Sequence, residues 1–278
     1  INDSTILGKK ILKLIKNGIN VYSAHTNLDS AKDGLNNYIA QKLLAKDTKI
    51  MDENFYSVYK MNIFVSKSIL AEVLSILNGS RELEFLEYKR VTYTSKVTER
   101  VLVNNEIKEL DSYNIQIMGE KNKLYSILNK IREKHSISEI AFEILPLENK
   151  HKTGTGFGRF FKLENPMSLE EYISFVKDKL NLDFVKVVKA NDKLIKKVAV
   201  VNGSGAEFWK KAYDMGADVF ITGDFKYHNA LDAYEKGLNI VDIGHYEAEH
   251  FFYEIIIKKL DDNLRVEVYN EKRILEIK

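Results

Sequence analysis

The chain has 278 residues, of which 45% are hydrophobic, and this is enough to bury a substantial core. Its 42 basic and 40 acidic residues give a net charge of +2 and are interleaved along the chain, so the charge indicates neither nucleic acid nor an anionic membrane as a partner. Cysteine is absent, which excludes disulfides and thiolate metal ligands and leaves imidazole and carboxylate groups for any metal.

The first residues and the longest apolar runs give an expectation for where the protein is located. Its first residues have neither the basic nor the apolar region of a secretion signal, and no apolar run approaches the roughly 20 residues that span a bilayer. We therefore expect a cytoplasmic protein. The first residue is isoleucine, and apolar residues at helical spacing already run from Ile6 to Ile15. We interpret the chain as a fragment or processed form that lacks an N-terminal segment.

Residues 1 to 54 predict the first, N-terminally incomplete lobe of an α/β domain. The short apolar run from Ile19 to Ala24 lies between a turn at Asn17 and Gly18 and a polar cluster, which is typical of a buried strand. Residues from Ala31 to Leu44 then predict a helix.

Residues 55 to 147 predict an inserted domain. Segments with β-branched alternation predict strands, and two segments carry an apolar stripe at helical spacing. The expected strands cover residues 59–65, 92–103, 113–118 and 141–147, and the expected helices cover residues 69–77 and 124–131. Two βαβ-like halves of this kind are typical of a ferredoxin-like α+β domain.

Residues 148 to 278 predict the second lobe, in which strands and helices alternate. The expected strands are Val198–Val201, Asp218–Ile221 and Ile240–Ile243, and the expected helices are Phe208–Tyr213, a helix through Ala233 and a long helix from Tyr246 to about Leu260. Such alternation indicates βαβ units. The predicted fold class is therefore α/β: a two-lobed, mostly parallel sheet interrupted by the ferredoxin-like insert.

Two polar clusters follow expected strands, at the edge where ligands bind in parallel sheets. His25 and Asp29 follow the first strand; the alternative is a helix-capping aspartate beside a turn histidine. His245 follows the last strand, and Glu249 lies four residues on, so that on a helix both side chains share a face and can reach one cation. The alternative for this second pair is a solvated ion pair.

A third cluster, Thr222-Gly223-Asp224, ends another strand, and His228 follows it. Asp224 is a candidate to orient an imidazole or a metal-bound water, and the alternative is a helix cap. Three of the six histidines thus lie just beyond strands. Their convergence, more than any single motif, indicates a metal site.

Two glycine-rich segments are weaker candidates. Residues 203–205, Gly-Ser-Gly, open a helix and predict either an anion site at exposed backbone amides or a plain tight turn. Residues 154–158 precede no evident helix, so the dinucleotide-binding pattern does not apply, and Arg159 either contacts an anionic substrate or is solvated. Trp209 is expected in the core.

Three runs together resemble one family, the NGG-interacting-factor-three-like proteins, whose members carry the name type 2 GTP cyclohydrolase I. The runs are Tyr-Ser-Ala-His-Thr-Asn-Leu-Asp at 22–29, Thr-Gly-Asp-Phe-Lys-Tyr-His at 222–228 and Asp-Ile-Gly-His-Tyr-Glu-Ala-Glu at 242–249. Residues 147–149, 156–159 and 198–205 are similar to the family as well. The resemblance covers nearly the whole chain.

The resemblance implies a toroidal homohexamer of α/β subunits, each with two divalent metal ions. Asp29, His245 and Glu249 would be metal ligands, and His25 and His228 would be catalytic groups that move protons. The insert is similar to the PII-like or CutA-like domain of long bacterial members. The family's remaining ligands are a His-His pair, which this sequence lacks, and His135 to Ser138 stand where a His-Pro-Tyr motif is expected.

The function that the resemblance implies is a metal-dependent hydrolysis that opens the ring of a purine nucleotide. It requires a metal-activated water and a proton donor. The alternative is a non-catalytic, metal-binding hexameric scaffold or regulator. Imidazole and carboxylate suit Zn, Fe, Mn, Co or Ni, so the identity of the metal stays open.

Overall fold

The structure, a computed structural model, describes residues 1–85, 88–135 and 140–269. The chain forms two compact units, one from residues 1–53 and 154–278 and the other from residues 54–153. The insert was expected at residues 55 to 147, so its first boundary differs by one residue and its second by six. The second boundary lies later because β6 (Phe142–Met167) runs without a break past residue 147. Within the described residues, none of the helices combines the length and the apolar character that a membrane span requires.

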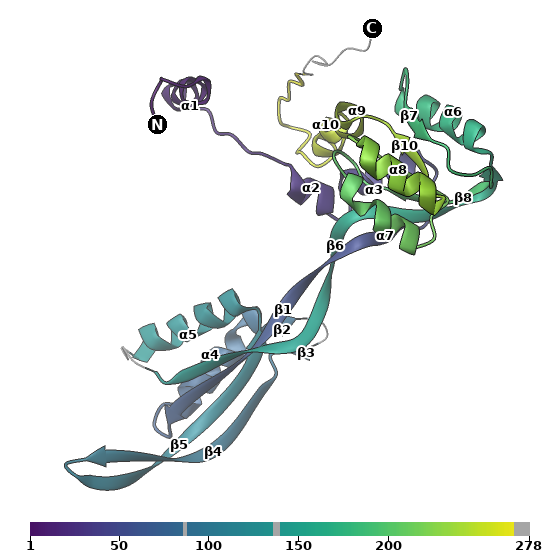
Figure 1. The fold of residues 1–278 in the computed structure, drawn as a ribbon. Coiled ribbons are helices and arrows are strands. Elements are labelled where there is room, and N and C mark those ends of the chain that lie inside the picture. The colour runs from purple at the N-terminus through teal and green to yellow at the C-terminus, as the bar shows by residue number, and fades with distance from the viewer. Residues whose placement is uncertain (86–87, 136–139, 270–278) are drawn as a thin grey trace. The chain divides into compact units, whose positions relative to one another are not determined.

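The first unit is a layered α/β structure (Figure 1). Its strands are the second part of β6 (Phe142–Met167), β7 (Lys186–Val188), β8 (Ile195–Val200), β9 (Val219–Thr222) and β10 (Asn239–Asp242). Its helices are α1 (Ile6–Lys16), α2 (Thr26–Ser30), α3 (Leu35–Lys42), α6 (Leu169–Leu180), α7 (Trp209–Asp214), α8 (Tyr227–Lys236), α9 (His245–Glu249) and α10 (Phe252–Ile257), with a 3₁₀ turn at Ala206–Phe208.

The α/β class predicted for this unit is confirmed, but its sheet is mixed rather than mostly parallel. The strand order is β6-β8-β9-β10-β7. Strands β8, β9 and β10 pair in parallel, whereas β6 and β7 pair antiparallel with β8 and β10. Parallel neighbours need a crossover connection, which α7 provides between β8 and β9 and α8 provides between β9 and β10.

Helices cover both faces of this sheet, and alternate strand residues point to opposite sides. Val198 and Val200 of β8 belong to one apolar cluster, together with residues of α3 and α6. Ala199 of β8 belongs to a second cluster, together with Trp209 of α7 and Ala233 of α8. Trp209 is 4% exposed, so its expected core position is confirmed.

Two expectations for the first lobe are wrong. Residues Ile19 to Ala24 form no strand, because none of the described strands pairs with them, and a strand requires hydrogen bonds to a neighbour. The helix expected from Ala31 to Leu44 begins only at Leu35. Ala31 and Gly34 have extended backbones, and a Cβ at Gly34 would lie 1.8 Å from the carbonyl oxygen of Leu28, so the chain turns sharply there.

The long C-terminal helix expected from Tyr246 is split into α9 and α10. The ring Nδ1 of His250 lies 3.1 Å from the carbonyl oxygen of Glu247. In an unbroken helix that oxygen would accept the backbone N–H of Phe251. The imidazole competes for this acceptor and favours a break between the two short helices.

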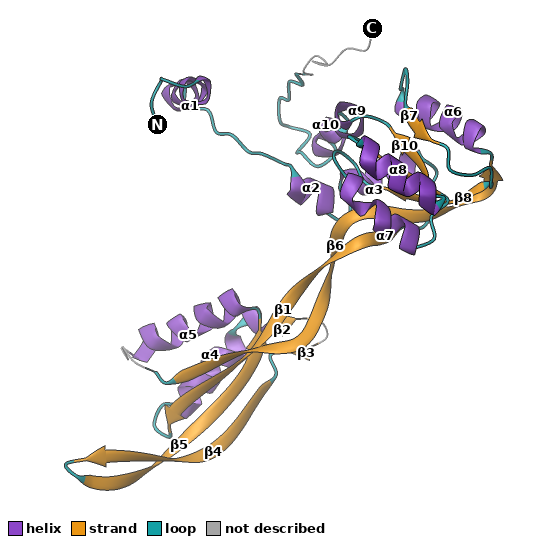
Figure 2. Ribbon diagram, in the orientation of Figure 1, coloured by secondary structure: helices purple, strands orange, loops and turns teal. Residues whose placement is uncertain are grey.

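The second unit has its own helices and strands (Figure 2) and its own apolar core. Its elements are β1 (Lys49–Ser66), α4 (Leu70–Gly79), a 3₁₀ turn (Arg81–Leu83), β2 (Glu84–Phe85), β3 (Tyr88–Lys89), β4 (Thr92–Val103), β5 (Glu106–Gly119), α5 (Lys121–His135) and the first part of β6. Its main strands are ordered β4-β5-β1-β6 in the sheet, and along the chain its main elements follow one another as β1, α4, β4, β5, α5 and β6. This succession is the one expected from the sequence, and the ferredoxin-like class of the insert stays a prediction. The expectation for residues 136–138 lies outside the described residues.

Candidate metal centre

The loops that follow β8, β9 and β10 are bound to one another at the carboxyl ends of these strands. The hydroxyl of Thr222 accepts the backbone N–H of Gly205 at 3.0 Å, and the N–H of Gly223 donates to the carbonyl of Gly203 at 2.9 Å. The buried carboxylate of Asp242 accepts the N–H groups of Phe225 and Gly244 at 3.1 and 3.0 Å. Because these bonds join all three loops, side chains on them are held in fixed relative positions.

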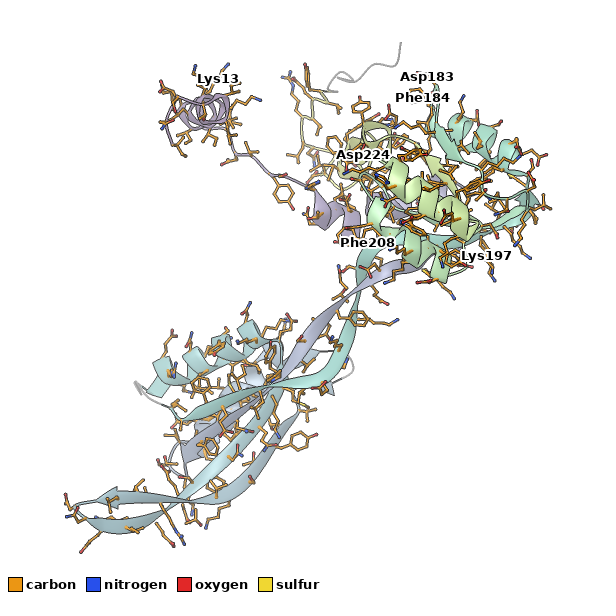
Figure 3. All side chains as sticks on the ribbon, in the orientation of Figure 1. Lys13, Asp183, Phe184, Lys197, Phe208 and Asp224 are labelled. Carbon is orange, nitrogen blue, oxygen red and sulfur yellow. The ribbon has the colours of Figure 1, made fainter. Side chains whose placement is uncertain are left out.

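His245 stands at the start of α9 and is held between two carboxylates. Its Nδ1 lies 2.8 Å from Oδ2 of Asp224, and its Nε2 lies 3.3 Å from Oε1 of Glu249, on the next turn. Asp224, labelled in Figure 3, lies two residues beyond the end of β9 and has a left-handed backbone, φ +55°. Partial burial opposes the charged imidazole, but the hydrogen bond to Asp224 and the charge of Glu249 outweigh it and raise the pKa of His245.

The carboxylate of Glu249 lies directly against the backbone of Gly203. A Cβ added at Gly203 would stand 2.4 Å from Oε1 of Glu249, and the φ of this glycine is +59°. The position therefore requires glycine both for its backbone and for its space. Gly205 donates its N–H to Thr222 and Gly203 faces a carboxylate, so the arrangement of this turn favours a tight packing turn over an anion site.

Asp29 reaches the same edge from α2. Its Oδ1 accepts a hydrogen bond of 2.8 Å from Nδ2 of Asn202, the residue that precedes Gly203. Burial raises the pKa of Asp29, while the Asn202 amide and the charges of His25 and His245 act in the opposite direction. The charge of His245 thus acts on the carboxylate of Asp29, although the two residues come from different segments of the chain.

The adjacent residues Asn202 and Gly203 thus contact Asp29 on one side and Glu249 on the other, and Glu249 contacts His245. All three predicted ligands lie at one edge of the sheet. These three side chains do not surround a common point as a complete set of metal ligands would. Across residues 1–85, 88–135 and 140–269, no three His, Asp or Glu side chains are grouped as a metal-binding cluster.

One pair of these donors has the spacing of two ligands of one divalent cation. Two ligand atoms, each about 2.1 Å from a shared ion, lie about 3.0 Å apart at a right angle and about 3.4 Å apart at the tetrahedral angle. Nε2 of His245 and Oε1 of Glu249 are 3.3 Å apart, within this interval. Because Nδ1 faces the carboxylate of Asp224, the tautomer with a proton on Nδ1 leaves the lone pair of Nε2 for the ion.

The two histidines expected to move protons lie in different settings. His25 precedes α2, is exposed, and interacts electrostatically with Asp29. His228 is exposed in the first turn of α8, where its ring contacts that of Tyr227. No hydrogen bond or ion pair among the described residues joins His228 to the three predicted ligands.

Arg159 serves neither of the two roles expected of it. Its side chain is 2% exposed, so it is not solvated, and its guanidinium donates to four backbone carbonyls, which leaves it no free fork for an anionic substrate. The acceptors are the carbonyls of Gly156, Gly158, Ala31 and Lys32, at 2.8 to 3.1 Å. Arg159 therefore joins the glycine-rich part of β6 to the segment that follows α2.

Two residues of this edge were not expected from the sequence. Asn202 follows β8 and binds Asp29, and Asn36 of α3 is completely buried and hydrogen bonded to both neighbouring segments. The strand-end rule that indicated His245 applies equally to Asn202. For Asn36 the signal is weaker, because an asparagine inside an expected helix is usually an exposed residue.

Comparison with known proteins places this architecture among related chains. The family description Duf34/NIF3 (NGG1p interacting factor 3) matches residues 1–274. A Bacillus subtilis protein named GTP cyclohydrolase 1 type 2 homolog is 33% identical over 264 residues, covering 91% of this chain and 70% of the relative. A protein of the same name from Halalkalibacterium halodurans is 32% identical over 284 residues, covering 97% of this chain and 75% of that relative.

Solved structures give the same result for the fold. The crystal structure of a Bacillus cereus protein related to NIF3 has a TM-score of 0.71 and 29% identity, covering 98% of this chain and 79% of that one. A Staphylococcus aureus protein has a TM-score of 0.65 and 25% identity, covering 97% and 77% of the two chains.

Proposed function

Because this chain belongs to the Duf34/NIF3 family, we propose that it is a divalent-metal protein that uses the edge holding Asp29, His245 and Glu249 to hydrolyse a purine nucleotide. The observation that carries the proposal is the spacing of Nε2 of His245 and Oε1 of Glu249, which suits two ligands of one ion. Asp29 adds a third donor at the same edge, through its contact with Asn202.

The residues around the proposed ligands have distinct roles in this proposal. Asp224 holds the ring of His245, and Gly203 leaves room for the carboxylate of Glu249. A divalent cation, when bound, supplies the Lewis acidity that makes water a nucleophile near neutral pH. His25, exposed and within electrostatic range of Asp29, is proposed to move a proton, with His228 as the second candidate. The names of the relatives support a GTP-like substrate for this site.

The proposal extends to a second metal ion and to assembly. Three protein donors are few for two ions, so the dinuclear centre is proposed with water or further residues completing it. A toroidal homohexamer in the cytoplasm is proposed from the family resemblance alone. Elemental analysis counts the metals per chain, and light scattering on the eluting protein gives the oligomeric state.

The function is tested with two conservative variants, Asp29→Asn and Glu249→Gln. The purified protein is expected to bind Zn²⁺ or Co²⁺ and to convert GTP, and each variant is expected to lose at least tenfold in metal affinity and most of the turnover. Asp192→Asn and Glu267→Gln remove the same charges from side chains that are 86% and 79% exposed, and both are expected to behave as the unaltered protein.

The rival function, a metal-binding scaffold or regulator, predicts a different result. It requires full metal binding with no turnover of GTP or other purine nucleotides. If the unaltered protein binds no divalent metal, both functions are refuted together.

A further inference from the structure

A closed ring of hydrogen bonds holds Asp29 in place. The side-chain amide of Asn36 donates to the backbone carbonyl of Asp29 at 3.0 Å, and its oxygen accepts the backbone N–H of Asn202 at 2.9 Å. The side-chain amide of Asn202 then donates to Oδ1 of Asp29 at 2.8 Å. The ring engages both the backbone and the side chain of Asp29, so it fixes where the residue lies and how its carboxylate is turned.

The chemistry of each partner fixes the direction of these bonds. A carbonyl and a carboxylate only accept hydrogen bonds, and a backbone N–H only donates. The carboxamide of Asn202 must therefore turn its Nδ2 toward Asp29, and that of Asn36 must turn its Nδ2 toward the Asp29 carbonyl. Reversing either amide would set two oxygens against each other.

One atom of this ring has no partner. Asn202 is 6% exposed, and its Oδ1 is buried without a hydrogen bond to any of the described residues. A buried, unsatisfied acceptor costs about 1 to 3 kcal/mol. Most buried polar atoms in folded proteins have a partner. This oxygen belongs to the same carboxamide that binds Asp29, and as an acceptor it would be stabilised by a hydrogen-bond donor or a cation.

We propose that Asn202 belongs to the cation site: its amide positions Asp29, and its side-chain oxygen is a further oxygen ligand, directly or through one water. The inference rests on the proposed metal function of this edge. A carboxamide oxygen is a ligand that hard divalent cations accept readily. With Asn202, the donors become one imidazole, two carboxylates and one amide oxygen, and Asn36 acts as a positioning residue behind them.

The test compares two buried asparagines in the full chain. Asn202→Ala removes both contributions to the site. Asn239→Ala is the matched control, since Asn239 is 0% exposed and equally bonded, but it accepts from the N–H groups of Ala190 and Asn191 at the opposite end of β10. Co²⁺ alone is the probe: its affinity is measured by competition with a chelator, and its visible absorption spectrum reports the number and geometry of the ligands.

Asn202→Ala is expected to weaken Co²⁺ binding by ten- to a hundredfold and to change the absorption spectrum. Asn239→Ala is expected to lower the melting temperature while the affinity and spectrum of the folded protein stay unchanged. Equal affinity and an identical spectrum in Asn202→Ala and the unaltered protein refute this inference alone. An unaltered protein that binds no Co²⁺ refutes it together with the proposed function.

The variant Asn202→Asp separates the two contributions. It keeps an oxygen but loses the amide and sets a second carboxylate against Asp29. If the oxygen is a ligand, Co²⁺ raises the melting temperature of this variant more than that of the unaltered protein, because the ion offsets the repulsion. A smaller rise than in the unaltered protein overturns the ligand role and leaves only the positioning of Asp29.

Discussion

At the scale of single residues, His245 owes its properties to its two neighbours. One ring nitrogen faces Asp224 at 2.8 Å and the other faces Glu249 at 3.3 Å. Both carboxylates favour the protonated ring, and together they raise the pKa of His245 in spite of partial burial. A metal ion needs the neutral ring, so protons and cations compete for this residue.

Replacing Asp224 by asparagine is expected to lower the pKa of His245, because the amide keeps an acceptor but loses the charge. A folded-state pKa above the unfolded value stabilises the fold below about pH 6.5, and this stabilisation is lost as the pH rises through the raised pKa. Asp224→Asn is thus expected to be less stable than the unaltered protein at acidic pH and equally stable near pH 9. NMR titration of the ring and urea unfolding at both pH values measure this.

Asp232→Asn, on the exposed face of α8, is the control for the change in net charge. It should leave the His245 titration where it is. An unchanged His245 pKa in Asp224→Asn would show that the contact with Asp224 does not control this ring.

The strand-end rule indicated His245 after β10, and Glu249 followed from its spacing of four residues. For Asp29 the rule was applied to residues 19–24, which form no strand, and Asp29 reaches this edge from α2 instead. The same rule did not single out Asn202, since asparagine is common in every turn. Arg159 was misjudged for a related reason. A local pattern shows that an arginine follows glycines, but only the fold shows that four carbonyls from two segments surround it.

At the scale of elements, the site depends on how closely the loops after β8, β9 and β10 approach each other. The backbones of these loops meet at Gly223. A Cβ there would lie 2.8 Å from the carbonyl oxygens of Gly203 and Gly244, which are backbone atoms of the two neighbouring loops. Backbone cannot move aside as a flexible side chain can, so a methyl group at Gly223 must push the loops apart.

Gly223→Ala is expected to destabilise the fold by about 1 to 3 kcal/mol and to weaken metal binding at the same time. The matched control is Gly79→Ala at the end of α4, where a Cβ would have no atom within 4 Å. That change is expected to be neutral or slightly stabilising, because alanine favours the helix. Urea unfolding and the Co²⁺ titration report the two effects, and normal metal binding in Gly223→Ala would contradict the importance of loop contact.

Elements were predictable where the sequence pattern itself determines burial. The runs at 198–201, 218–221 and 240–243 are mostly apolar, with one aspartate in each of the last two, and each forms a central strand in the structure. The run Ile19 to Ala24 has the same pattern but no pairing strand, so its conformation depends on a partner that a local pattern cannot supply. The antiparallel edges β6 and β7 were missed because pairing direction depends on connections rather than on composition.

At the scale of the whole molecule, the two units have separate apolar cores. The clusters that hold α3, α6, α7 and α8 to their sheet contain only residues of the first unit. The cluster around α4 and α5 contains only residues 54–153. The chain enters and leaves the second unit at adjacent points, since the hydroxyl of Thr153 donates to the carbonyl of Asn54 at 3.1 Å.

A chain in which residues 55–152 are replaced by a two-residue Asn-Gly turn is therefore expected to fold and to keep its metal site. Both of its apolar clusters remain intact, and such a turn suits two adjacent antiparallel strand ends. A single cooperative unfolding transition and a Co²⁺ affinity within about threefold of the full chain are the expected results. Non-cooperative unfolding of the shortened chain would show that the first unit depends on the insert for its core.

The ring through Asn36 and Asn202 also bears on when the site appears during folding. Asp29 and Asn202 are 173 positions apart, so their contact closes a very long loop, and we expect it to form late in folding. An ion at this edge would then bind almost exclusively to the finished structure. By mass action such an ion would stabilise the whole folded unit, and its release would lower the stability of segments far from the site.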